Sequence, residues 1–188
     1  MILPIHIIGS KVLRRKATDF NLEDPKEYAE LISLTANMYE TMESADGLGL
    51  AAPQVGVSKR LFLVDGTPLI DEDPSFANFK KEFINAKIIE RGGKKETTNE
   101  GCLSIPDVHE DVSRESKIRI QYYDLDREFH DETYHGLPAI IIQHEYDHLD
   151  GILFTDYLSP IRRRLISKKL QKISRGKFER RYRFQLAK

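Results

Sequence analysis

Cysteine is scarce in this chain, with one copy in 188 residues. A single cysteine excludes an internal disulfide framework, so we expect a reducing compartment, the cytoplasm. No apolar run approaches the roughly 18 residues that a membrane-spanning helix needs, which argues against a membrane protein. The apolar start, Met1–Gly9, lacks a charged leader and a small-residue cleavage site and is interrupted by Pro4 and His6. It therefore predicts an edge strand and not a signal peptide.

Acidic residues are nearly absent from the end of the chain. Residues 161–188 contain twelve Lys or Arg and one Glu, a net charge of +11, which leaves −12 for residues 1–160. The whole chain is 40% hydrophobic, which suits one soluble domain with a sizeable core. We predict a main domain over residues 1–160 and a basic C-terminal extension over residues 161–188. The extension should contain a helix from Arg162 to Ser174 and then a strand from Tyr182 to Leu186.

Residues 136–151 predict a short helix that carries a metal site, with a proline in its first turn and a glycine just past its end. Within it, His144 and His148 lie one turn apart. Their Cβ atoms should be roughly 5–6 Å apart, so both imidazoles can reach one metal ion. Glu145 lies about 100° further around the axis. That position is off the metal but near its open coordination site, where a general base is needed.

Two histidines need a third protein ligand. Zinc peptidases with the His-Glu-x-x-His motif place that ligand downstream, as a histidine after Gly-x-x or as a more distant glutamate. Here Phe154 occupies the histidine position, while Asp156 is too close and Glu179 too far. The candidate is therefore upstream, at Cys102. A lone cysteine is commonly a small buried hydrophobe. This one, however, follows the flexible Gly101 in a chain whose two histidine ligands lack a third partner.

The glycine-punctuated loop Asp46–Gly56 superficially matches the dinucleotide-binding fingerprint Gly-x-Gly-x-x-Gly/Ala. That fingerprint requires a strand before it and a helix after it. Here a predicted helix, Pro25–Ser44, precedes the loop and a predicted strand, Arg60–Asp65, follows it. We therefore reject a nucleotide site. What remains is a loop whose glycines let another backbone approach closely and which ends in the amide side chain of Gln54.

The rest of the chain predicts further strands. Glu82–Glu90 reads as one strand, and Lys117–Asp124 with Glu128–Tyr134 reads as a hairpin. Residues 66–80 predict a surface loop, and Arg91–Asn99 predicts a polar turn or a frayed hairpin. The expected fold class is α+β, with antiparallel or mixed sheets packed around the central metal-binding helix, an N-terminal helix and a basic C-terminal helix.

Three segments read together resemble the peptide deformylase family, in its bacterial, iron-dependent form. The family's motifs Gly-x-Gly-x-Ala-Ala-x-Gln, Glu-Gly-Cys-x-Ser and His-Glu-x-x-His occur in the family's order as Gly47–Gln54, Glu100–Ser104 and His144–His148. The resemblance covers roughly residues 1–160, the expected catalytic domain. One departure is His109, where many bacterial members carry an arginine near the substrate backbone, so we expect one substrate contact to differ.

The resemblance implies a hydrolase that removes the formyl group from the N-terminal formyl-methionine of nascent peptides and releases formate. It implies that Cys102, His144 and His148 bind one metal ion per chain, by preference Fe²⁺, with Zn²⁺ or Ni²⁺ as substitutes. It also implies that Glu145 is the acid/base. These roles agree with the chemistry, because a three-ligand metal leaves a position for water and can lower the pKa of that water to about 7.

Two further features are implied by the resemblance. The oxygen that becomes negative during amide hydrolysis needs donors placed in advance, which Gln54 and the backbone N–H of Leu103 would supply. A pocket for the methionine side chain would be lined by Leu48, Gly49, Gly101, Leu137, Ile140 and Ile141.

Two other functions stay open from the sequence. A metalloendopeptidase shares the His-Glu-x-x-His helix, but its downstream ligand is missing here. A ribosome- or RNA-binding protein with a structural metal would use residues 161–188, but it would need neither Glu145 nor Gln54. The basic extension itself predicts either contact with the anionic ribosome surface or a solvated helix face. Neither DNA nor a membrane is an expected partner.

Overall fold

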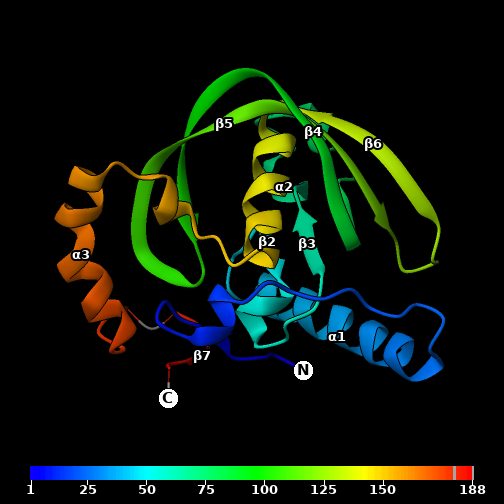
Figure 1. Ribbon diagram of the computed structural model, residues 1–188, viewed down its shortest axis with the longest axis horizontal. Helices are drawn as coiled ribbons and strands as arrows, with labels where there is room; N and C mark the ends of the chain where they lie inside the picture. Colours follow the sequence, from blue (N-terminus) through cyan, green and yellow to red (C-terminus); the bar gives the residue numbers. More distant parts are fainter. Residues whose placement is uncertain (180, 188) are drawn as a thin grey trace.

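Two long antiparallel strands, β4 (Lys80–Cys102) and β5 (Ile105–Tyr123), curve around the helix α2 (Gly136–Leu149), as Figure 1 shows. The computed structural model describes residues 1–179 and 181–187. These strands belong to an antiparallel five-stranded sheet of order β2-β3-β4-β5-β6. The other elements are β1 (Ile5–His6), η1 (Lys11–Arg14), α1 (Pro25–Ser44), β2 (Gly49–Ala51), η2 (Ala52–Val55), β3 (Leu61–Asp65), η3 (Thr67–Leu69), η4 (Pro74–Phe76), β6 (Phe129–His135), η5 (Phe154–Tyr157), α3 (Pro160–Ser174) and β7 (Phe184–Gln185).

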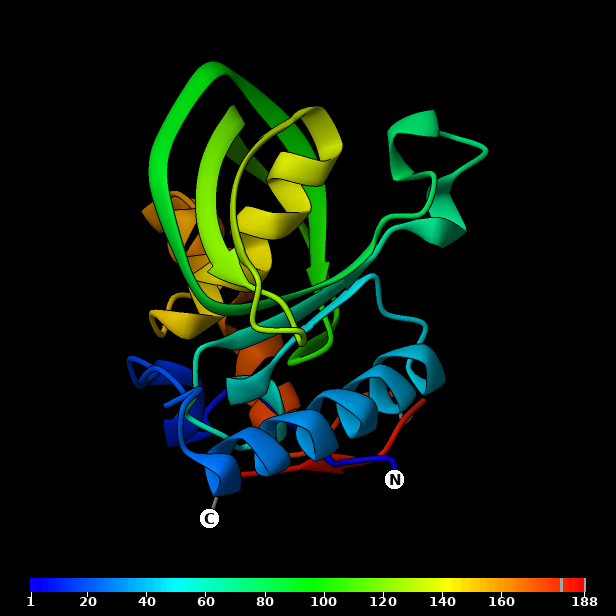
Figure 2. The same cartoon turned by 90° about the vertical axis from the view of Figure 1, so that its right-hand side faces the viewer.

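The helix α1 has the range that the sequence predicted. Asp24 caps it by accepting a hydrogen bond from the Lys26 N–H at 2.8 Å, and Pro25 occupies the first turn, where it loses no hydrogen bond. In its apolar stripe Leu31 and Met38 are fully buried, and Leu34 is partly buried. Figure 2 shows α1 lying across the base of the molecule, below the curved strands. Among the described residues, no helix combines the length and the hydropathy needed to cross a membrane.

The ribbon formed by β4 and β5 corrects one prediction. Arg91–Asn99 is not a turn or a frayed hairpin, because β4 continues to Cys102 and pairs with β5 from Ile84 onward. Residues 105–116, for which the sequence predicted no element, form the partner strand. Most side chains of residues 89–99 are exposed or half-buried, so alternation gave no signal. Gly92 and Gly93 resembled turn residues but lie at a shift in the strand register, where Gly93 has a φ of +79°.

The helix α2 forms the centre of the largest core cluster. Ala139, Ile142 and Leu149 are fully buried and pack in the same cluster as aromatic side chains of β3 and β4. Each large apolar side chain buried in this way contributes about 1.5–3 kcal/mol of transfer free energy. The helix ends before Gly151, which has a φ of +74° and where a Cβ atom would lie 2.8 Å from the backbone of Arg14. The predicted glycine stop is therefore confirmed, and only glycine fits there.

The two ends of the chain meet. Strands β1 and β7 are two residues each and pair in parallel, Ile5 opposite Phe184 and His6 opposite Gln185. The predicted N-terminal and C-terminal strands are therefore both present, although shorter than expected. The helix α3 packs on the body through the buried Ile173. Residues 180 and 188 of the predicted extension lie outside the described residues.

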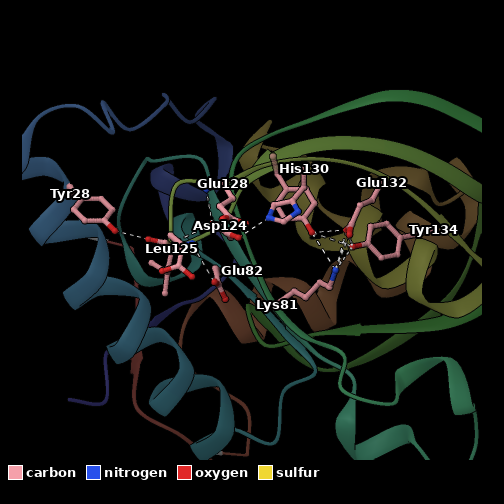
Figure 3. Close-up of polar contacts among 11 residues, drawn as sticks. Tyr28, Lys81, Glu82, Asp124, Leu125, Glu128, His130, Glu132 and Tyr134 are labelled. Carbon is pink, nitrogen blue, oxygen red and sulfur yellow. Dashed lines mark hydrogen bonds and ion pairs between the residues drawn. The ribbon is translucent and has the colours of Figure 1, made fainter.

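A polar cluster stabilises the sheet across β4, β5 and β6 (Figure 3). Lys81 of β4 donates to both carboxylate oxygens of Glu132, at 3.2 and 3.1 Å, and to the Tyr134 hydroxyl at 3.1 Å. Tyr122 and Tyr134 also donate to Glu132. Burial opposes ionisation of Glu132, but these donors outweigh it and lower the pKa of the carboxyl. The cluster therefore ties β4, β5 and β6 together through one ionised glutamate.

Candidate metal centre and substrate cleft

The centre is formed where α2 faces the end of β4. The Cys102 Sγ lies 3.3 Å from the His148 Nε2, and the His144 and His148 rings are 5.3 Å apart. One ligand atom from each of the three residues lies within 4.8 Å of the other two. A thiolate with two imidazoles is a donor set that suits Zn²⁺ and Fe²⁺. The residues therefore fit a metal ion of the expected class.

A buried chain of polar groups supports this centre. The His144 Nδ1 lies 2.8 Å from a carboxylate oxygen of Glu100, so the Nε2 is the nitrogen left for the centre. Arg114 donates to Glu100 at 2.6 and 3.0 Å and to Asp147 at 2.7 Å. The Tyr157 hydroxyl donates to the same Asp147 at 2.9 Å. Such contacts fix the orientation of metal-binding imidazoles.

Sequence reasoning assigned no role to Glu100, Arg114 or Asp147. Glu100 stands two residues before Cys102 and was visible only as part of a motif. Arg114 lies 14 residues from Glu100 and 33 residues from Asp147 in the sequence. The pairing of β4 with β5, which could have revealed the first contact, was not predicted.

The acid–base properties differ among the residues of the centre. Burial raises the pKa of Glu145 to about 7, a value suited to proton transfer near neutral pH. Burial and the nearby charge of His144 hold the pKa of His148 well below its usual range, so this imidazole is neutral. Burial alone would lower the pKa of His144, but hydrogen bonds with Cys102 and Glu100 raise it well above its usual value. A metal ion must therefore displace a proton from this pair, as is general for thiolate–imidazole sites.

The loop predicted at Asp46–Gly56 contributes β2 and η2 and reaches the centre. The Gln54 Oε1 accepts from the Ala51 N–H at 2.7 Å, which turns the Nε2 toward Cys102, 3.5 Å from its Sγ. At Gly49 a Cβ atom would lie 2.4 Å from the Oε1 of Glu145. The absence of a side chain at this glycine leaves room for the glutamate carboxylate. The sequence had predicted the close approach of another backbone here, but the group that approaches is a side chain.

A cleft of about 650 Å³ opens above the centre, within the usual range for small-molecule sites. Of the predicted site residues, His148 is 1% exposed and does not line the cleft. All the others line it: Leu48, Gly49, Gln54, Gly101, Cys102, Leu103, Leu137, Ile140, Ile141, His144 and Glu145. The structure thus brings the predicted site residues together in one place.

The cleft has further walls, most of which the sequence did not indicate. Leu69 and Glu72, from the loop predicted over residues 66–80, form one wall. The C-terminal residues Arg181 and Tyr182 form another. His109 also lines the cleft, opposite Gly101 in the strand pairing. These residues come from separate parts of the chain, and only the folded arrangement places them around one cavity.

Comparison with known proteins decides the family. The family model described as "Polypeptide deformylase" matches residues 2–164. The chain belongs to the polypeptide deformylase family. A peptide deformylase of Christiangramia forsetii is 47% identical over 192 residues, covering 98% of this chain and 96% of its own length. A peptide deformylase of Flavobacterium psychrophilum is 48% identical, covering 99% and 97%.

Solved structures agree with this membership. The chain is similar to a peptide deformylase of Legionella pneumophila with a TM-score of 0.79 and 35% identity, over 94% of this chain and 97% of that one. It is similar to a peptide deformylase of Thermotoga maritima with a TM-score of 0.74 and 35% identity, over 85% and 99%. As a peptide deformylase, the protein is a hydrolase that removes the N-terminal formyl group of nascent peptides. The comparisons give no support to an endopeptidase or to a purely structural metal site.

Proposed function

We propose that Cys102, His144 and His148 hold one metal ion and that Glu145 moves the protons of deformylation. The observation that carries this assignment is the convergence of one thiol and two imidazoles beside a buried carboxylate at the floor of a cleft. The resemblance to iron-dependent deformylases favours Fe²⁺, with Zn²⁺ or Ni²⁺ as substitutes. A reducing cytoplasm is the location that suits a single cysteine kept reduced as a metal ligand.

A bound metal ion would supply a Lewis acid that lowers the pKa of water. The remaining work falls to the protein. Glu145 accepts a proton from the water that attacks the formyl carbon and passes it to the leaving amine. Its Oε2 is buried and, among the described residues, has no hydrogen-bond partner, so it is available for this exchange. The Nε2 of Gln54 and the N–H of Leu103 donate to the oxygen that becomes negative.

The apolar part of the cleft selects the first residue of the substrate. Leu48 and Leu137 face the cleft together with Ile140 and Ile141. A methionine side chain loses little on entering such a pocket, whereas a charged side chain loses its hydration without gaining a partner. We therefore propose formyl-methionyl peptides as the preferred substrates.

Release of formate tests the proposed activity directly. Protein loaded with iron under anaerobic conditions should release formate from a formyl-Met peptide and leave its internal peptide bonds intact, as seen by mass spectrometry. The matching N-acetyl-Met peptide is the control, because its extra methyl group alone distinguishes it. Cleavage of internal bonds, or no formate from the loaded protein, would contradict the proposal.

A second proposal concerns delivery to the ribosome, and the charge of +11 on residues 161–188 favours it. The helix α3 exposes Arg164, Lys168 and Lys172, whereas the ammonium of Lys169 is engaged with the Asp107 carbonyl. Such an exposed basic face can bind a polyanion, and its affinity should fall steeply with salt because counterions are released.

Charge reversal tests the delivery proposal. Replacing Arg164, Lys168 and Lys172 with glutamate should abolish pelleting with ribosomes at low salt and leave hydrolysis of a short formyl peptide unchanged. The matched control makes the same change of charge on the body, by glutamate substitutions at the exposed Lys11, Arg15 and Lys16. Equal binding by the α3 variant and by native protein would mean that α3 presents only a solvated face.

A further inference from the structure

The turn after Cys102, which forms part of the cleft wall, has a backbone conformation that is unusual for a two-residue turn. Cys102 pairs with Ile105, so Leu103 and Ser104 alone connect β4 to β5. Two-residue turns that match the twist of antiparallel strands require a positive φ in at least one central residue. Neither Leu103 nor Ser104, both within the described residues, has a positive φ. The turn therefore depends on contacts from outside the hairpin.

Those contacts come from both ends of the chain. The Tyr182 hydroxyl donates to the Leu103 carbonyl at 2.5 Å, and the Ile8 N–H donates to the Ser104 carbonyl at 2.8 Å. The segments that carry Tyr182 and Ile8 are joined to each other through the parallel pairing of β1 with β7. Both carbonyls of the turn are thus attached to one small sheet made of the two termini.

The C-terminal region also contacts the start of β5, just after this turn. Asp107 has a φ of +61°, which is uncommon outside glycine. Its side chain accepts from the Glu179 N–H at 3.2 Å, and its carbonyl accepts from the ammonium of Lys169. Tyr182 itself lines the cleft. The segment after α3 is therefore a part of the site wall, in addition to any role of its charge.

We propose that Tyr182 is a positioning residue. Its hydroxyl holds the Leu103 carbonyl and thereby the backbone conformation of Leu103, so that the Leu103 N–H points at the substrate oxygen. This inference rests on the proposed role of Leu103 in deformylation. Burial raises the pKa of Tyr182, so the hydroxyl stays protonated and donates. The carbonyl and the N–H of Leu103 lie on either side of the same Cα atom. Loss of the hydroxyl allows rotation about the φ and ψ angles of Leu103, so the N–H no longer has a fixed direction.

The test compares two tyrosines whose hydroxyls each donate a hydrogen bond to a leucine carbonyl. Tyr28 also donates its hydroxyl at 2.5 Å to the carbonyl of a leucine in a turn, Leu125 (Figure 3), but it does not line the cleft. Tyr182→Phe and Tyr28→Phe each remove one hydroxyl and keep the ring. We expect Tyr182→Phe to lower kcat about tenfold, less than the roughly 10²–10³-fold cost of deleting an oxyanion donor. KM and metal content should match those of Tyr28→Phe, whose kcat should equal that of native protein.

A readout independent of activity follows the Leu103 carbonyl itself. With ¹³C-carbonyl leucine and ¹⁵N-serine, only Leu–Ser pairs give a signal, and the chain has two, Leu103–Ser104 and Leu158–Ser159. In zinc-loaded protein, Tyr182→Phe should shift the carbonyl signal of Leu103 and leave that of Leu158 in place. Tyr28→Phe should move neither signal.

The two readouts separate failure of this inference from failure of the proposed function. Equal kcat values for Tyr182→Phe and Tyr28→Phe would overturn the positioning role, whether or not the Leu103 signal moves. If native protein released no formate, the proposed function would fall, and an unshifted Leu103 signal would then overturn the positioning of Leu103 by Tyr182 as well. A shifted signal together with a lower kcat supports both.

Discussion

The two halves of the site are held by different kinds of contact. His144, Glu145 and His148 lie within five residues of one helix, and the hydrogen bonds of α2 fix their spacing. The other half, Cys102 and Leu103, lies at a turn held by Tyr182 from 79 residues away and by the N-terminal segment. The helix half therefore depends on local sequence, whereas the turn half depends on the assembly of the whole chain.

The largest expected effect separates proton transfer from metal binding within the helix half. Glu145→Gln should lower kcat by about 10²–10⁴-fold, the usual contribution of a general acid–base group. Because Glu145 is not a ligand in the proposed site, metal content should stay at one ion per chain. Atomic emission on the purified variant and a formate assay check both parts. A metal-free glutamine variant would mean that Glu145 ligates, and full activity would remove it from the chemistry.

The next effect concerns the polar chain that joins the two halves. Arg114→Met leaves Glu100 and Asp147 buried without their cation, which should cost about 3–5 kcal/mol of unfolding free energy. Loss of the orientation of His144 should weaken metal binding about 10–100-fold. Urea unfolding and competition with a chelator measure these quantities.

The matched control for that variant is Arg119→Met. Arg119 forms a two-bond pair with Asp131 on the surface, and solvent-exposed pairs contribute little to stability. Its metal affinity should equal that of native protein. Similar losses in the two variants would show that any arginine removal harms the protein, without a special role for the buried chain.

A smaller effect is expected in the substrate pocket. Leu48→Trp places a bulky ring among the apolar residues of the cleft, so KM for a formyl-Met peptide should rise about tenfold, the cost of misfitting one or two methylenes. Metal content should not change. Steady-state kinetics with formyl-Met and formyl-Ala peptides measures the effect. An unchanged KM for both peptides would place the methionine side chain elsewhere.

The smallest effect lies in the sheet cluster around Glu132, away from both halves. Since its partners lower the pKa of Glu132, the charged form stabilises the folded state above the usual carboxyl pKa, and this contribution is lost as the pH falls through the lowered value. Glu132→Gln should therefore be less stable at pH 7 by under about 1 kcal/mol. The difference should shrink below pH 4 in urea unfolding, with no change in kcat. A difference independent of pH would exclude ionisation as the cause.

The same contrast explains what could be predicted from the sequence. The helix half was predictable because the spacing of His144 and His148 on a helix already places both imidazoles on the same side. The range of α1 followed from its N-terminal cap and its apolar stripe. The β4–β5 ribbon was missed because residues 89–99 of β4 have no buried face and because β5 buries the charged Glu110 and Arg114 among its apolar residues, which hides the alternation in the sequence. Arg114 and Tyr182 were missed for a related reason. Each acts through a partner that is distant in sequence, and no local pattern in one sequence marks such a contact.

Metal reconstitution followed by formate release tests the central claim most directly. Chelator-treated protein should be inactive, and titration with Fe²⁺ or Zn²⁺ should restore deformylation of a formyl-Met peptide to a plateau at one ion per chain. Cys102→Ala, which removes the turn-half ligand, should stay inactive throughout the same titration and retain the native fold by circular dichroism. Full activity without metal, or restoration of Cys102→Ala at one equivalent, would contradict the account.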